Sequence, residues 1–164
     1  MELKKRISPK YIFIGLYFVA FLAFLIYGLQ PAGAVQSEQI SGKLEVPSIG
    51  LVSDVTNLEL EDRKLNTPDN IVGSFSNHKN KTLLIGHSTT VFEGLKNVKL
   101  GDGLVYNDSS YNVIDVETIE KDQIKMSELL KSEENDTLVL MTCVGTLLGD
   151  GDSTHRLIIT AIRD

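Results

Sequence analysis

Short apolar runs, separated by polar or glycine-containing turns, fill most of the chain after residue 42. These runs are rich in Val, Ile and Leu and are too short for typical helices, a pattern that indicates β-strands. The expected strands lie at 43–55 (two strands joined by a Pro/Gly turn), 71–76, 82–86, 104–106, 111–116, 137–143 and 156–162. About eight short strands with few helices predict a mainly β fold, a closed or nearly closed barrel.

The segment 104–116 is expected to form a β-hairpin that turns at Asn107-Asp108. In its second strand, apolar and polar residues alternate as they do in a half-buried strand. This alternation predicts two faces, one with Tyr111, Val113 and Asp115 and the other with Asn112, Ile114 and Val116.

Three other segments have patterns that do not fit strands. Thr56 to Pro68 is polar with a few leucines, and is expected to be a short helix or an irregular crossover. Thr90 to Val98 predicts a helical turn that packs its apolar side chains on the sheet. Glu120 to Lys131 is charged but carries an apolar stripe, so a short helix is expected there.

The N-terminal region has the pattern of a membrane anchor. Tyr11 to Leu29 contains no charged residue, and a helix of that length spans roughly 28 Å, close to the thickness of a bilayer core. The expected organisation is a cytoplasmic basic tail at 1–10, a transmembrane anchor at 11–29, a linker at 30–42 and an extracellular domain at 43–164. A cleaved signal peptide is the alternative, because Ala32-Gly33-Ala34 resembles a cleavage site, but the apolar run exceeds the usual signal core. Both interpretations export the domain, and the first places it at the cell membrane.

The charge of the chain argues against nucleic-acid binding. The net charge is −6, and the first ten residues hold four basic residues and one acidic residue. Everything after Lys10 therefore has 12 basic and 21 acidic residues, a net charge of −9. Phosphate would repel a domain of this charge, so we expect no nucleic-acid partner and no adhesion to an anionic membrane without a tether.

Three of the expected strands carry a reactive side chain at one end. The run 82–86 is followed by His87, the run 137–143 ends on Cys143, and Arg156 opens the last run thirteen residues later. A thiol has an ordinary pKa of about 8.5 and attacks as the thiolate, and an imidazole can accept its proton and return one to a leaving amine. A guanidinium beside the acyl carbon can stabilise an oxyanion. The combination predicts an acyl-transfer site.

Each of these residues also has a structural interpretation. The single cysteine cannot form an internal disulfide, and it could be a buried small hydrophobe. His87 could be a turn residue bonded to the backbone, and Arg156 an ordinary surface residue. His78 and His155 are rival bases, and His87 is preferred because it terminates a β-prone run.

Four motifs in order resemble the signature of the sortases, the membrane-anchored cysteine transpeptidases of mainly Gram-positive bacteria. They are Val46-Pro47-Ser48-Ile49-Gly50-Leu51, Ile85-Gly86-His87-Ser88, Leu140-Met141-Thr142-Cys143 and Arg156-Leu157-Ile158, with Leu100-Gly101-Asp102 also matching. The resemblance covers about residues 43–163 and includes the order His, Cys, Arg and the N-terminal anchor.

The resemblance implies an eight-stranded sortase-like barrel with short helices and a thiol-dependent activity. Cys143 would attack a backbone carbonyl in a C-terminal sorting signal of LPXTG type carried by surface proteins. An amine, typically of a peptidoglycan precursor, would resolve the acyl-enzyme and attach the protein to the cell wall. His87 would be the general acid and base, Arg156 would hold the substrate or its oxyanion, and Thr142 would help to position the acyl group.

Three features depart from the family pattern. Val139 stands where the family often has a threonine four residues before the nucleophile, which removes any role for that hydroxyl, and the linker has no aspartate–aromatic lid motif, which argues against the pilus-polymerising class. The last expected strand is not followed by a membrane segment, which favours a compact anchoring enzyme. No cofactor is expected. Some sortases bind calcium, for which Glu117, Glu120 and Asp122 are the candidates here, and a solvated acidic face is the alternative.

Two other functions stay open from the sequence. Water in place of an amine would turn the same acyl-enzyme chemistry into that of a membrane-tethered cysteine protease. A non-catalytic β domain that binds a component of the cell wall is the second alternative. The other cysteine acyl-transferases fit less well, because papain-like proteases have the cysteine before the histidine.

Overall fold

The computed structural model describes residues 39–61, 64–78, 80–149 and 152–164. They belong to one compact unit, Glu38–Asp164. The expected cytoplasmic tail, the transmembrane anchor and most of the linker lie outside the described residues. Within the described ranges, no helix is both long enough and apolar enough to cross a membrane.

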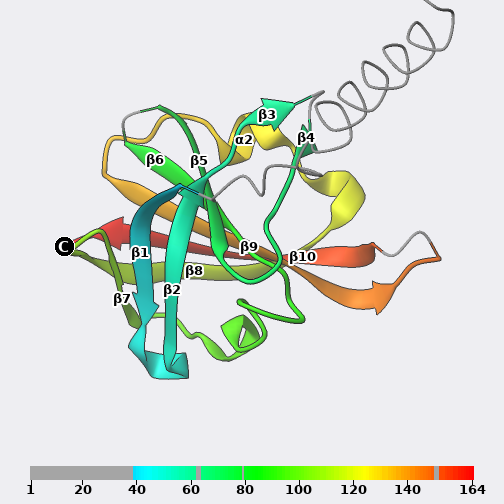
Figure 1. Cartoon of the computed structure of the whole chain (residues 1–164), viewed down its shortest axis with the longest axis horizontal. Coiled ribbons are helices and arrows are strands. Elements are labelled where there is room, and N and C mark those ends of the chain that lie inside the picture. Colours follow the sequence, from blue (N-terminus) through cyan, green and yellow to red (C-terminus); the bar gives the residue numbers. More distant parts are fainter. Residues whose placement is uncertain (1–38, 62–63, 79, 150–151) are drawn as a thin grey trace, which may run out of the picture. The chain divides into compact units, whose positions relative to one another are not determined.

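Eight of the described strands close into a barrel, as the strand pattern predicts (Figure 1). Around the barrel the order is β1-β2-β5-β6-β9-β10-β8-β7, with β7 pairing back onto β1. The pairs β2–β5 and β6–β9 are parallel, and the other neighbours are antiparallel. The strands are β1 (Ile40–Val46), β2 (Leu51–Asn57), β5 (Val72–His78), β6 (Lys81–Ile85), β7 (Gly103–Tyr106), β8 (Ser109–Glu120), β9 (Thr137–Leu147) and β10 (Ser153–Arg163).

The two turns expected at the start and middle of the domain form as their residues dictate. A single 3₁₀ turn, η1 (Pro47–Ile49), separates β1 from β2, and Gly50 closes it at a φ of 65°, which glycine adopts without strain. Asn107 and Asp108 join β7 to β8 with φ values of 48° and 62°. Both angles lie in the left-handed region that favours Asn and Asp in two-residue hairpin turns.

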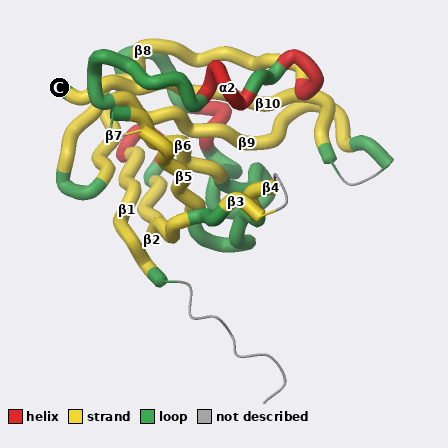
Figure 2. Tube along the Cα trace, turned by 90° about the horizontal axis from the view of Figure 1, so that it is seen from above, coloured by secondary structure: helices red, strands yellow, loops and turns green. Residues whose placement is uncertain are grey.

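The connection between β2 and β5 matches one of the two expectations for residues 56–68, the crossover, and not the other, the helix. It crosses over between two parallel strands, but it contains a small hairpin, β3 (Leu60–Glu61) with β4 (Lys64–Leu65), in place of a helix. The other two segments contain short helices as predicted: η2 (Leu95–Asn97), η3 (Lys121–Gln123) and α2 (Met126–Leu129). Figure 2 shows β3, β4 and α2 outside the ring of barrel strands.

The predicted faces of β8 are correct up to Val113 and wrong beyond it. Tyr111 and Val113 are buried, and Ile114 is 50% exposed. The pairing with β10 shifts at this point, because Thr160 faces Asp115 whereas Ala161 faces Val113. This β-bulge reverses the alternation, so Val116, not Asp115, packs against the core.

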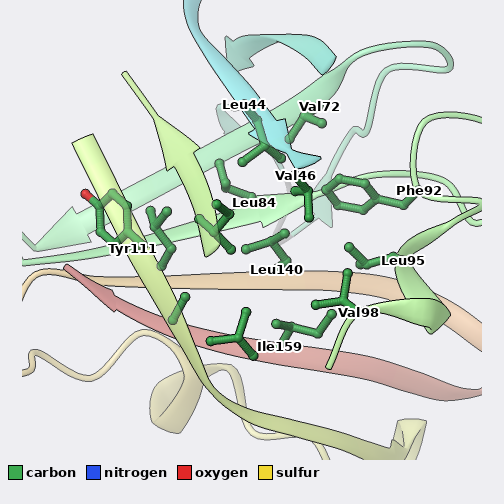
Figure 3. Close-up of a cluster of buried hydrophobic side chains, with 14 of the residues drawn as sticks. Leu44, Val46, Val72, Leu84, Phe92, Leu95, Val98, Tyr111, Leu140 and Ile159 are labelled. Atoms are coloured by element: carbon green, nitrogen blue, oxygen red, sulfur yellow. The ribbon is translucent and has the colours of Figure 1, made fainter. Parts of the chain in front are cut away.

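The barrel interior holds the main hydrophobic core, part of which Figure 3 shows. Its members come from most of the strands and include Leu44, Val46, Leu84, Leu140 and Ile159. The segment after β6 closes one side with Phe92 and Leu95, which are 1% and 0% exposed. A second, smaller cluster lies on the opposite face of β6, β9 and β10, and its buried members are Leu83, Val139 and Ile158.

Candidate active site

The register of three neighbouring strands brings the predicted reactive residues together. In the parallel pair β6–β9, Ile85 is opposite Met141, and the Gly86 N–H donates to the Met141 carbonyl at 3.4 Å. His87 and Cys143 each follow two residues later, so they lie at the same level of the sheet. His87 comes after the end of β6, whereas Cys143 lies within β9, which continues past the predicted end to Leu147. On the other side of β9, Arg156 of β10 pairs directly with Cys143. The order β6-β9-β10 therefore places imidazole, thiol and guanidinium in one row.

The same row lies on one face of the sheet, because side chains alternate along a strand. Leu84, Leu140 and Ile159 point into the barrel core, and Leu83, Val139 and Ile158 belong to the outer cluster. Continuing the alternation puts Cys143 on the outer face with Met141, and His87 with Ile85. The outer cluster thus forms an apolar surface on the same face of the sheet, next to the reactive groups.

A cavity of about 580 Å³ opens on this face and is lined by all three reactive residues. Its walls are largely apolar, since β3, β4 and α2 cover the outer face of the sheet. The apolar lining residues are Leu60, Leu65, Phe75, Ile85, Met126, Leu130 and Met141. A cavity of this volume and character is suited to an extended peptide with apolar side chains.

His87 is the histidine that the structure places at this cavity. Its side chain is 44% exposed, and Nε2 lies 3.3 Å from the Thr67 carbonyl oxygen and 3.9 Å from Asp69 Oδ1. Asp69 is 92% exposed, so this pairing is weak and screened by solvent. The ring is therefore held from the β4–β5 connection and keeps access to solvent and substrate.

The two rival histidines occupy other positions. His78 pairs with Lys81 across the β5–β6 turn, at the end of β6 opposite to the one that leads to His87. His155 precedes Arg156 in β10, and its Nδ1 lies 2.8 Å from the Thr154 hydroxyl. Among the described lining residues of the cavity, His155 is absent.

Arg156 is held firmly by the start of its own strand. Its side chain is 14% exposed, and Nη1 donates to the carbonyl oxygens of Ser153 and His155, each at 3.0 Å. Nη2 donates to Asp152 Oδ1 at 2.7 Å. The surface arginine considered from the sequence is thus a largely buried residue with a fixed guanidinium.

Asp152 is a residue of the site that the sequence analysis missed. Its carboxylate also pairs with Lys121 at 2.5 Å and lies 4.0 Å from Cys143 Sγ. The hydrogen bond from Lys121, the Ser153 backbone N–H and the Arg156 guanidinium lower the pKa of Asp152 to about 2. In the sequence, an aspartate in a Gly/Asp turn looks like a solvated loop residue, and no periodicity distinguishes it.

Thr142 lies on the inner face of β9, next to the nucleophile in sequence but pointing the other way. It is 3% exposed, and its hydroxyl donates to the Gly86 carbonyl at 2.7 Å. This bond ties the ends of β6 and β9 together just before His87 and Cys143. The hydroxyl thus supports the backbone under the reactive pair, and its predicted effect on the acyl group would be indirect.

Thr142→Val is expected to lower the free energy of unfolding by about 1–2 kcal/mol, because it removes the donor of a buried hydrogen bond at nearly constant volume. Denaturant unfolding followed by circular dichroism measures this change. Thr146, which is exposed on the same strand, provides the control, and Thr146→Val should leave stability within about 0.5 kcal/mol. Equal effects of the two substitutions would contradict the role assigned to the Thr142 hydroxyl.

The acidic residues considered for calcium do not form a described metal site. Glu117, Glu120 and Asp122 are exposed. Across the ranges described here, no group of three or more His, Cys, Asp or Glu side chains is arranged to hold a metal ion.

Comparison with known proteins agrees with the geometry. The family model for the Sortase domain matches residues 44–164, more than half of the chain. A comparison with curated protein sequences gives no match.

Solved structures of sortases share the fold at low sequence identity. A lid mutant of sortase A from Corynebacterium diphtheriae is 19% identical with a TM-score of 0.61, covering 86% of this chain and 78% of that chain. Sortase A from Listeria monocytogenes is 18% identical with a TM-score of 0.60, covering 76% and 87%. Sortase C1 from Streptococcus agalactiae is 20% identical with a TM-score of 0.59, covering 80% and 70%. Given the match of the family model and the eight-stranded barrel, the chain belongs to the sortase family of cysteine transpeptidases.

Proposed function

We propose that this protein cleaves an LPXTG-like C-terminal sorting signal and transfers the cleaved protein to an amine of the cell wall. The observation that carries the proposal is the cavity lined jointly by His87, Cys143 and Arg156. A nucleophile, a proton carrier and a fixed cation around one peptide-sized cavity are what acyl transfer requires.

In the first step, His87 takes the proton of the Cys143 thiol, and Sγ forms a bond to the carbonyl carbon of the scissile peptide. Negative charge develops on the carbonyl oxygen, and the Arg156 guanidinium stabilises it by donating N–H groups. The C–N bond then breaks, and His87 gives a proton to the departing amine. The product is a thioester on Cys143, and the C-terminal part of the signal leaves.

In the second step, the acceptor amine attacks the thioester carbon, and His87 takes a proton from it. The C–S bond breaks and His87 passes this proton to the departing sulfur, which restores the thiol, so the reaction needs no cofactor. The apolar residues of β3, β4 and α2 form a wall beside Cys143 that suits the leucine and proline of such a signal. The proposed setting is the outer surface of a bacterial membrane, with the anchor at 11–29 holding the enzyme beside surface proteins and peptidoglycan precursors.

The test is incubation with a sorting-signal peptide in the presence and absence of an amine such as triglycine. Mass spectrometry should show a thioester on Cys143, and the amine should divert the product from the free acid to the amide. Cleavage with product unchanged by amine would identify a hydrolase instead. Absence of any acyl-enzyme with a panel of sorting peptides would refute both forms of the proposal.

Arg156→Lys is expected to reduce kcat/KM for transfer by about 10²–10³-fold, since a lysine ammonium is a point charge and does not replace the planar fork. The rate of peptide transfer under steady-state conditions measures the effect. Arg163→Lys is the matched control, because Arg163 is an exposed arginine at the other end of the same strand. Normal activity of the Arg156→Lys variant would show that its guanidinium does not stabilise the oxyanion.

A further inference from the structure

The Asp152 carboxylate contacts two groups that the proposed chemistry uses, the Cys143 thiol and the Arg156 guanidinium. One oxygen, Oδ1, accepts from Arg156 Nη2 at 2.7 Å and is 4.0 Å from Cys143 Sγ, which donates toward it. The other, Oδ2, is 2.5 Å from Lys121 Nζ. A single anion thus contacts the nucleophile, the predicted oxyanion donor and a second cation, Lys121.

The first consequence concerns Arg156. Two carbonyl oxygens occupy its Nη1, and Asp152 takes a bond from Nη2, so three of the donors of the guanidinium are engaged within the protein. A developing oxyanion is, like this carboxylate, an oxygen with negative charge, and it draws on the same guanidinium. Asp152 therefore competes with the transition state for Arg156.

The second consequence concerns Cys143. Its sulfur lies 4.0 Å from the Asp152 carboxylate oxygen toward which it donates. Once the proton leaves, two negative charges face each other across about 4 Å, a repulsion equivalent to about fivefold in population even with screening like that of water. The same aspartate therefore places a negative charge beside the sulfur that attacks as an anion.

We propose that Asp152 holds the enzyme in a resting state by occupying Arg156 and Cys143, and that the bound peptide must displace it. This inference rests on the roles given to Cys143 and Arg156 in the proposed function. It adds a residue, and a step of displacement, that those roles do not contain.

Lys121 can hold the Asp152 carboxylate after it separates from Arg156. Its side chain is 40% exposed, against 29% for Asp152 and 14% for Arg156, so the lysine end of the network is the end nearer to solvent. Lys121 comes from η3, directly after β8, and β8 is the neighbour of β10. A carboxylate released from Arg156 keeps its ion pair with Lys121, so displacement does not leave an uncompensated charge.

The experiment uses Asp152→Asn, which keeps the shape and an acceptor oxygen for Arg156 but removes the negative charge. Cys143 is the single cysteine, so alkylation by the neutral reagent iodoacetamide, followed by mass spectrometry, reports on its thiolate alone. We expect the alkylation rate at pH 7 to rise about fivefold and KM for a sorting peptide to fall. Lys121→Gln should do the opposite, because it leaves Asp152 closer to Arg156 and Cys143.

Asp122→Asn is the matched control, because it removes the same charge from an exposed residue next to Lys121. It should leave the alkylation rate of Cys143 and KM for the sorting peptide unchanged. If Asp152 only positions Arg156, Asp152→Asn should leave the alkylation rate of Cys143 unchanged and lower kcat/KM for the sorting peptide. That result would overturn the proposal. Thermal unfolding of each variant separates these effects from loss of the fold. The alkylation assay contains no sorting peptide, so it tests Asp152 even if the enzyme proves not to be a transpeptidase.

Discussion

Replacing Cys143 with alanine is expected to abolish the acyl-enzyme and to lower amine transfer by about 10³-fold or more, as loss of a nucleophile does in other acyl-transfer enzymes. The reason is that no other described residue of the cavity is a thiol or a carboxylate that could attack in its place. Mass spectrometry of the enzyme with a sorting peptide, and chromatography of the transfer product, measure the two effects.

The fold should survive this change, which makes the result interpretable. Cys143 is partly exposed, and the substitution removes one sulfur atom from the outer face of β9. We therefore expect an unchanged circular dichroism spectrum and peptide binding close to that of the wild type. A non-catalytic surface domain would give a variant with full activity in every assay, and that outcome would remove the enzyme hypothesis.

The placement of the three reactive residues could be predicted only in part from strand ends. The apolar runs that carry them are visible in the sequence, and His87 follows the end of β6 as predicted. Cys143 and Arg156, however, lie inside β9 and β10, because β9 continues to Leu147 and β10 begins at Ser153. Strand pairing then needs only the correct order, β6-β9-β10, to bring them into one row. Their chemical roles remain predictions, because the geometry shows proximity to a shared cavity and not catalysis.

The walls of the cavity could not be predicted in the same way. The lining residues Leu60, Leu65, Met126 and Leu130 come from the β2–β5 and β8–β9 connections. The apolar stripe of 120–131 predicts a helix there but not where it packs, and only the closed barrel brings these residues onto the outer face of β6 and β9. The hairpin β3–β4 has strands of two residues each, too short for any alternation to reveal. The bulge at Ile114 likewise depends on the partner strand β10.

Asp152 and Thr142 illustrate a further limit of sequence patterns. The importance of Asp152 follows from the register that places Arg156 opposite Cys143, and the Gly/Asp turn around it gives no sign of this. Thr142 looks like part of the site because it is next to Cys143, but alternation sends its hydroxyl to the inner face. A residue next to a nucleophile on a strand points to the opposite face of the sheet. It is therefore expected to stabilise the backbone beneath the nucleophile and not to contact the substrate.

Exchanging His87 for glutamine is expected to lower kcat/KM for transfer by about 10²–10⁴-fold, the usual contribution of a general acid and base. Glutamine can still donate a hydrogen bond to the Thr67 carbonyl that His87 Nε2 approaches at 3.3 Å, but it cannot give a proton to the leaving amine. His155→Gln is the matched control, because this histidine is also partly buried and close in sequence to Arg156, yet does not line the cavity. A leaving group that needs no proton, such as a thiol in a thiodepsipeptide substrate, should restore much of the acylation rate in the His87→Gln variant and change little in the control. Equal losses in the two variants, or no recovery with the activated substrate, would show that the proton comes from another group and that proximity of His87 to Cys143 reflects the fold alone.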